Sequence, residues 1–511
     1  MNRKICDWLF LAICATLCFT HVPEVLKFKF LLGPTSDKLA VFPLLAGLCY
    51  TIYCQWKYGD VFVNWPKFKK YILVYLVVVF ASLVWGLYQF PYYVEILDGP
   101  KNLSTAIYNY LLAKGFAVQE DQVLLWLMWF RYVKNFFLIM FFDFGGAYMV
   151  YCWYAHNWKH GFRMMCRGCF AGLMIVLGYG ILDFFYLAHN ATAAEILLSL
   201  NPYCHRIVTD YQWWPEVIFS GGFRSVFCEP SFFGMWSAVV LPFVWGRYML
   251  SHRSKQVLIS LGLVIWLAFA LFLSQSRTCI GVLFIELFCM VVGVLWLNRS
   301  ELLIKATGIV MGVSMAFFFS MCFFDSYMVN KDYSSTGDVV MAYVDRNIKT
   351  IPIFNKGRSN IQRLGVIEAQ MRIFAAHPLM GVGQGLSQYY VYDYIDDEVR
   401  DNYEMKLWAR MTKEKGMLRS LPPYLSEFPL MFAQKGLLGG VIYYLPLFIL
   451  LYKFGRRFFS QKMSFAELIL SIALIGTIST GFNDPFDYVW WIWIIYGIGF
   501  AMFCGKEQRV E

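Results

Sequence analysis

The amino-acid sequence predicts an all-α integral membrane protein with about 12 transmembrane helices and a large extracytoplasmic helical loop between helices nine and ten. Three observations lead to this prediction. Hydrophobic residues make up 59% of the 511 residues and charged residues only 15%, which is too few charges to coat soluble globular domains. The apolar residues are gathered in runs of about 20, the length that a helix needs to cross a bilayer. Basic residues cluster between alternate runs.

The apolar runs give the candidate spans. Each is bounded by polar or charged residues, and aromatic residues, at 19% of the chain, suit belts at both membrane interfaces. The runs lie at residues 5–21, 39–56, 71–89, 130–154, 168–188, 232–250, 257–273, 278–297, 306–324, 430–452, 465–482 and 488–504.

The basic clusters predict the orientation. Short loops rich in Lys and Arg stay in the cytoplasm. Such clusters precede the first run and follow the second, fourth, sixth, eighth and tenth runs. We therefore expect both termini in the cytoplasm of a multi-pass protein. Lys27, Lys29 and Lys38, in the first outer loop, are the one discordant group.

This topology divides the chain into three parts. Residues 1–324 would hold nine spans with outer loops at 91–122 and 189–230, and residues 429–511 would hold the last three. Residues 325–428 would form one large extracytoplasmic loop domain. Loops of that length are usually functional or disordered, and this one has helical patterning, so we expect a folded cap.

Composition also bounds partners and cofactors. The net charge of +10 is spread in short clusters rather than one patch, so no nucleic-acid partner is expected. Most of the 14 cysteines lie inside apolar runs, where cysteine acts as a small hydrophobic residue. Cys204 and Cys228 share one outer loop and could pair in an oxidising compartment. No His/Cys group has the spacing of a zinc site, and we expect neither metal nor cofactor.

The densest polar motif, residues 221–231, contains Arg224 and Glu229. Pro230 fits the first turn of a helix, so Glu229 would lie at a helix N-terminus with Arg224 one short loop away. A helix N-terminus favours phosphate, and Arg adds a planar fork that matches phosphate oxygens. The alternative is that Glu229 is a helix cap and Arg224 its salt-bridge partner.

Three more arginines are candidates. Arg277 lies in a tight outer turn between two runs, where an Arg is costly unless it pairs, lines a wet cavity or reaches the interface. Residues 360–376 have the pattern of an amphipathic helix, on which Arg363 and Arg372 would lie on opposite faces. Arg372 has Glu368 four residues before it as an ordinary partner, so Arg363 is the better ligand.

The remaining candidates are His377, which precedes the Gly-rich turn 381–385, and several acidic residues. A structural turn is the favoured interpretation of the glycines. Asp183 and Glu286 lie inside apolar runs and either line a proton or ion path or pair within the bundle. Asp484, in the last outer turn, could face the same cavity as the arginines.

In this order and spacing, the motifs resemble the O-antigen polymerase and ligase superfamily of bacterial inner membranes. The segments that resemble it are Arg224…Glu229-Pro230-Ser231, Ser274-Gln275-Ser276-Arg277, Arg363 before His377-Pro378-Leu379-Met380-Gly381-Val382-Gly383, and Gln434-Lys435-Gly436-Leu437-Leu438-Gly439. The resemblance covers roughly residues 220–445. The first 200 residues match only in being apolar and helical.

The resemblance implies a GT-C-like, metal-independent glycosyltransferase that uses polyprenyl diphosphate. Donor and acceptor would be glycans on undecaprenyl diphosphate at the outer face of the bacterial inner membrane, as in the synthesis of lipopolysaccharide or exopolysaccharide. A polysaccharide co-polymerase that regulates chain length would be a further partner. Glu229 and Arg224 would be catalytic. Arg224, Arg277, Arg363 and Arg372 would bind the diphosphate, with His377 and Asp484 as further candidates.

A Wzy-type polymerase is favoured over a ligase, which would transfer the glycan to lipid A-core. Ligases usually have a His-Asn pair late in the long loop, and the corresponding residues here, 421–425, contain no His. Polymerases often show Arg-x10-Gly elements, and Arg372 to Gly383 fits one. A transporter or lipid flippase is the second alternative, but it would need repeated halves and polar groups near the midplane.

Overall fold

A computed structural model describes residues 3–59, 65–100, 104–205, 216–298, 300–328, 336–347 and 358–504. Every regular element in these ranges is a helix, which confirms the predicted all-α fold. Seven segments are long and apolar enough to cross a membrane, and two shorter apolar helices follow them. The seven are Pro66–Tyr88, Glu120–Tyr154, Trp158–Leu187, Ser254–Leu273, Arg277–Leu297, Ser300–Met328 and Glu427–Phe459.

Each of the twelve predicted spans coincides with a helix, although five of these helices are shorter or less apolar than the seven. The first half of the chain contains α1 (Arg3–Thr16), α2 (Lys29–Leu32), α3 (Val41–Tyr58), α4 (Pro66–Tyr88), α5 (Tyr93–Leu97), α6 (Thr105–Ala113), α7 (Glu120–Ile139), α8 (Gly145–Tyr154), α9 (Trp158–Leu187) and α10 (Ala191–Cys204). The middle contains α11 (Pro230–Leu250), α12 (Ser254–Leu273), α13 (Arg277–Leu297) and α14 (Ser300–Phe323).

The stretch expected to form a cap is helical where it is described. It contains α15 (Thr336–Asn347), α16 (Arg358–Ala376), α17 (Ser387–Tyr394), α18 (Asp397–Arg400) and α19 (Tyr403–Lys415). The helix predicted over 360–376 is therefore confirmed as α16, although Leu364 and Met371 of its predicted apolar face are exposed. The chain then continues through α20 (Glu427–Phe459), α21 (Phe465–Thr480) and α22 (Trp491–Cys504).

The fourth predicted span begins earlier than the sequence indicated. We expected it at 130–154, whereas helix begins at Glu120 and continues to Tyr154. A π-helical turn at Met140–Phe144 separates α7 from α8 and contains Asp143. Such turns inside longer helices are often found at functional sites.

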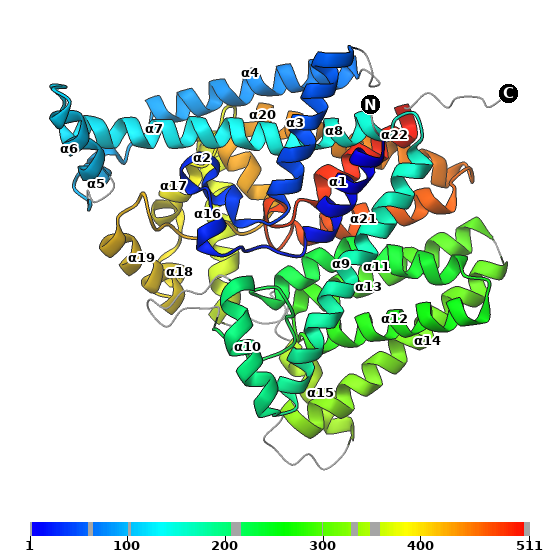
Figure 1. Ribbon diagram of the computed structural model, residues 1–511. Helices are drawn as coiled ribbons and strands as arrows, with labels where there is room; N and C mark the ends of the chain where they lie inside the picture. Colours follow the sequence, from blue (N-terminus) through cyan, green and yellow to red (C-terminus); the bar gives the residue numbers. More distant parts are fainter. Residues whose placement is uncertain are drawn as a thin grey trace.

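Figure 1 shows how the helices are arranged. The start of α1 and the end of α22 lie at the same end of the molecule, and α17, α18 and α19 lie at the opposite end, as do α5 and α6. An even number of crossings predicts this placement of the two chain ends. The cap helices also pack on the bundle, because α16 contacts α20 and α17 contacts it as well.

Helix α11 lies in the centre of the second half of the bundle. It packs against α12, α13 and α21, and nearly every residue from Phe233 to Met249 is buried. A helix that is apolar on all sides is buried on all sides. Its N-terminus, where Glu229 lies, is thereby held in place by three other helices.

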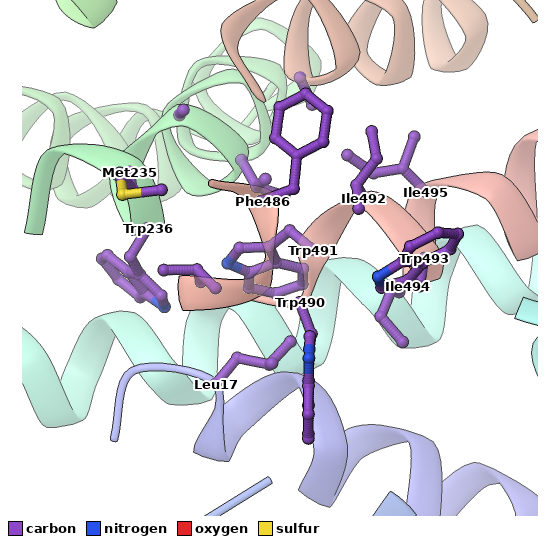
Figure 2. Packing of buried hydrophobic residues seen from close by; sticks show 14 of the residues in the cluster. Leu17, Met235, Trp236, Phe486, Trp490, Trp491, Ile492, Trp493, Ile494 and Ile495 are labelled. Carbon is purple, nitrogen blue, oxygen red and sulfur yellow. The ribbon is translucent and has the colours of Figure 1, made fainter. Parts of the chain in front are cut away.

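A tryptophan-rich segment at the start of α22 joins the two halves of the bundle. Figure 2 shows Trp490 and Trp491 near Leu17, Trp236 of α11 and the turn at Phe486, with Trp493 further along α22 beside Ile494. All three tryptophans of this segment are buried. Their large rings fix the position of the turn that precedes α22.

Candidate functional site

The turn between α21 and α22, residues 481–490, is the point where several distant segments meet. The first residues of α20 bond to it, with Ser426 N donating to Asn483 O (3.3 Å) and Glu427 N to Gly481 O (2.7 Å). From α16, Arg363 Nη1 donates to Asn483 Oδ1 (3.0 Å) and to Asn483 O (3.3 Å). The cap helix α16 is thus fastened to the membrane bundle through Arg363.

Arg277 lies beside Arg363. It is the first residue of α13, and its Nη1 donates to Asn360 Oδ1 at 2.6 Å. Asn360 precedes Arg363 by three residues on α16, which puts the two on one face of that helix. The charge of Arg363 acts directly on Arg277. Two neighbouring guanidinium groups repel each other, so the arrangement suits an anion between them.

Glu229 lies at the N-terminus of α11, with Pro230 as the first helical residue, as predicted. Its side chain does not cap the helix and instead accepts a hydrogen bond from Ser231 Oγ (3.2 Å). Glu229 thus occupies the N-cap position, as in the alternative interpretation, but its side chain makes no capping hydrogen bond. The carboxylate also lines the cavity described below.

Asp484, in the same turn as Asn483, is buried with 5% of its surface exposed. Burial raises the pKa of its carboxyl to about 7, the charge of Arg363 holds the pKa down, and the nearby Glu229 raises it further. A carboxyl with such a pKa can exchange a proton at neutral pH. Asp484, Glu229 and Arg363 therefore act on one another, although they lie far apart in the sequence.

Arg224 has a different environment from the other two arginines. It is fully buried, and its guanidinium donates to the carbonyl oxygens of Glu216 (2.9 Å), Val217 (2.7 Å) and Cys228 (3.2 Å). Its backbone N–H donates to Asp183 Oδ2 (3.0 Å), so Asp183 pairs within the bundle. Arg224 and Glu229 form no salt bridge, so that alternative is wrong. Arg224 holds the loop whose last residue precedes Glu229.

The Gly-rich turn docks into a break in α20. Gly436 has φ +64°, which interrupts the helix, and a Cβ there would lie 2.2 Å from Leu379 O. Across this break Val382 N donates to Ala433 O (3.0 Å) and Leu437 N to Pro378 O (2.7 Å). The glycines thus serve a structural turn, as favoured from the sequence, and the turn presents Gln384 to the cavity.

A cavity of about 680 Å³ lies next to Glu229. Its wall is formed by the connection before α3, the π turn of α7–α8, the end of α19 with the residues before α20, and the turn before α22. Aromatic side chains line it, among them Trp408, Tyr424, Tyr488 and Trp490. The volume lies within the range of small-molecule sites, roughly 300–1,000 Å³.

Charged side chains of both signs line the cavity, among them Lys38, Asp143, Lys435 and Asp487. Among the described residues, the ammonium of Lys38 has the ring of Trp490 as its partner (4.4 Å), and that of Lys435 has the ring of Tyr443 (4.2 Å) and the sulfur of Met431. Buried charges are costly unless they are paired or hydrogen-bonded.

Two sequence candidates lie elsewhere. Arg372 is half exposed and pairs with Asp396 through both terminal nitrogens (2.7 and 2.9 Å), so the prediction of Glu368 as its main partner is wrong. His377 follows the last residue of α16 and lies against the ring of Tyr390, in a surface pocket with Trp85. Burial lowers the pKa of His377.

Two more expectations can be compared with the structure. Cys204 and Cys228 are both free thiols. Glu286 is fully buried, and within the described ranges neither of its carboxylate oxygens has a hydrogen-bond partner.

Sequence reasoning missed part of this site. Asp143 and Lys435 lie inside apolar runs, where any charge is a signal that could have found them. Lys38 was noticed only because it disagreed with the charge rule for loops. Asn360 and Asn483 carried no signal, because a single Asn in a polar segment is ordinary.

The family comparison covers part of this geometry. Residues 262–406 match the family described as O-Antigen ligase, a range that includes Arg277 and Arg363. No curated protein matches the chain. The match agrees with the resemblance over these residues, and the long apolar helices are those of a membrane-embedded protein.

Proposed function

We propose that the chain polymerises undecaprenyl-diphosphate-linked oligosaccharide repeats at the outer face of the bacterial inner membrane. The observation that supports this most directly is that two cationic and two acidic side chains lie close together around the turn between α21 and α22. Arg277 and Arg363 are held by asparagines, with Glu229 and Asp484 beside them and a cavity adjoining.

The reaction needs these two kinds of group. A hydroxyl oxygen of the acceptor repeat attacks the anomeric carbon of the donor glycan, and the bond from that carbon to the diphosphate oxygen breaks. The lipid diphosphate leaves with the bonding electrons, so negative charge grows on it. Arg277 and Arg363 stabilise that charge, because guanidinium groups held in advance need no reorganisation during the step.

The acceptor hydroxyl must lose its proton in the same step. Glu229 and Asp484 are the candidate bases, and the pKa of Asp484 near 7 suits that role at neutral pH. Arg224 is a positioning residue in this proposal, since it holds the carbonyl of Cys228 and so the loop that carries Glu229.

The residues at 421–425 favour polymerase over ligase. The stretch 421–425, where ligases usually have their histidine, contributes Leu421, Pro423 and Tyr424 to the cavity and no histidine. A carboxylate base replaces histidine in this proposal. The ligase remains the second candidate because the matching family is described by that activity.

Surface polysaccharide profiling of a deletion strain tests the proposal. Lipid A-core that carries one repeat and no long chains, restored by the wild-type gene, is the expected result. Lipid A-core without any repeat would indicate the ligase instead. Lipid-linked repeats that accumulate on the cytoplasmic face would indicate a flippase and overturn the proposal.

A further inference from the structure

The inner part of the cavity contains polar groups that the protein itself leaves without partners. Gln384 and Asp143 are 8% and 2% exposed, and both line the cavity. Among the described residues, Gln384 Oε1 and Asp143 Oδ2 accept no hydrogen bond. Buried acceptors without a partner are uncommon in folded proteins and call for an explanation.

Donors in the same cavity are only partly satisfied, since the ammonium of Lys435 donates to the sulfur of Met431, a weak acceptor. Within the described part of the chain, neither Lys38 nor Lys435 lies within ion-pairing distance of a carboxylate, and their ammonium groups face aromatic rings. An ammonium carries three N–H donors, which a ring face does not satisfy fully. The cavity therefore offers donors and acceptors side by side, between aromatic walls.

A ligand that fits this lining must both donate and accept hydrogen bonds and must have apolar faces. A simple anion would satisfy the lysines and repel Asp143, and a hydrocarbon would satisfy neither. Sugar hydroxyls donate and accept in turn, and the C–H faces of a sugar ring can stack on Trp408 or Tyr424.

We propose that this cavity is the acceptor-glycan subsite, in which Gln384, Asp143 and Lys38 recognise hydroxyl groups of the incoming repeat. This inference rests on the proposed function, since it names what binds next to Glu229. It gives roles to residues outside the arginine motifs. It also explains why Lys38 is basic in a loop that the charge rule expects to be poor in lysine.

The experiment is a binding titration with the full-length chain in lipid nanodiscs. The probe is the repeat-unit oligosaccharide of the producing strain, released from its lipid by mild acid and labelled with a fluorophore at its reducing end. Fluorescence polarisation gives the Kd. We expect saturable binding, and we expect Gln384→Met and Asp143→Asn each to raise the Kd about tenfold, the change for one lost hydrogen bond of about 1.4 kcal/mol.

The chain offers a matched control for each variant. Gln370 is buried with its Oε1 unpartnered among the described residues, like that of Gln384, but it does not line the cavity. Glu286 is the control for Asp143, because it is also buried with unpartnered carboxylate oxygens among the described residues but does not line the cavity. Gln370→Met and Glu286→Gln should leave the Kd within about twofold. If Asp143→Asn fails to accumulate, Lys38→Met makes the same test outside the long helices.

The outcomes separate this inference from the proposed function. No binding by the wild-type chain, or equal Kd values for cavity and control variants, would overturn the subsite even if the arginines prove essential for polymerisation. Arg363→Lys should bind the free oligosaccharide normally, because this probe has no diphosphate. Tenfold effects at Gln384 and Asp143 would support the subsite even if polymerisation tolerates Arg363→Lys.

Discussion

Replacing Arg363 with Lys tests whether its guanidinium fork, rather than its charge, is needed. Nη1 of Arg363 is used on Asn483, at 3.0 Å from the side chain and 3.3 Å from the carbonyl. The rest of the fork can then reach a phosphate oxygen while the anchor to Asn483 stays in place. Lys has one nitrogen on a flexible stem, so it can keep the anchor or bind the phosphate, but not both in the same geometry.

The size of the effect follows from what is lost. Removing one fixed donor to the developing charge of a transition state costs about 3–4 kcal/mol, or roughly 10²–10³ in rate. Lys keeps the positive charge that holds down the pKa of Asp484, so the base should still titrate normally. We therefore expect Arg363→Lys to slow polymerisation by that factor without shifting its pH dependence.

The assay is polymerisation of lipid-linked repeats by the purified chain in nanodiscs, followed as a ladder of product lengths. Arg372→Lys is the matched control, since Arg372 is on the same helix but pairs with Asp396 at the surface, where ion pairs contribute little. It should polymerise like the wild type. If Arg372→Lys is inactive while Arg363→Lys is active, the assignment of Arg363 to the diphosphate is wrong.

Four further predictions concern the base, the break in α20, metals and topology. Because Asp484 has a pKa of about 7 and accepts a proton only when ionised, polymerisation should rise with pH through about 7, and Asp484→Asn should abolish that rise; a rise that persists places the titrating group elsewhere. Gly436→Ala should lower thermal stability by about 1–3 kcal/mol from backbone strain alone, whereas Gly281→Ala, with nothing near its Cβ, should not; equal unfolding temperatures would contradict the role of the break. Polymerisation should survive EDTA, since no outer loop has the pattern of a divalent-metal site, and inactivation that magnesium reverses would count against this. A cysteine at Asp397 should be labelled from outside intact cells and cysteines at Ser254 and Ser460 only after permeabilisation, and the reverse pattern would invert the topology.

The helical fold could be predicted from the sequence because membrane spans are specified locally. A run of about 20 apolar residues is enough to predict a helix, and each predicted run coincides with one. Helix α16 was predictable for the same kind of reason, as its apolar residues recur with the helical period. The start of α7 at Glu120 was missed because Arg131 and Lys134 interrupt its apolar pattern, so the apolar residues 123–129 were not counted with the span.

The site was only partly predictable, because it depends on contacts between distant segments. Residue type and position near the membrane surface were enough to single out Arg277, Arg363, Glu229 and Asp484. Nothing local distinguished Arg224 from them, and only its three carbonyl partners show that its guanidinium holds a loop. The partner of Arg372 was missed because Asp396 comes from a later segment, whereas the sequence suggested a neighbour on the same helix.

The central position of α11 has a consequence for how the protein is made. This helix is complete at residue 250, but one of its main packing partners, α21, ends at residue 480. At the usual ~5–20 residues per second, translation separates the two by on the order of tens of seconds. During that interval α11 has no α21 to cover it, and the turn that places Asp484 beside Glu229 does not yet exist. Under the proposed function, the nascent chain would therefore lack one of its two candidate bases until its last helices insert.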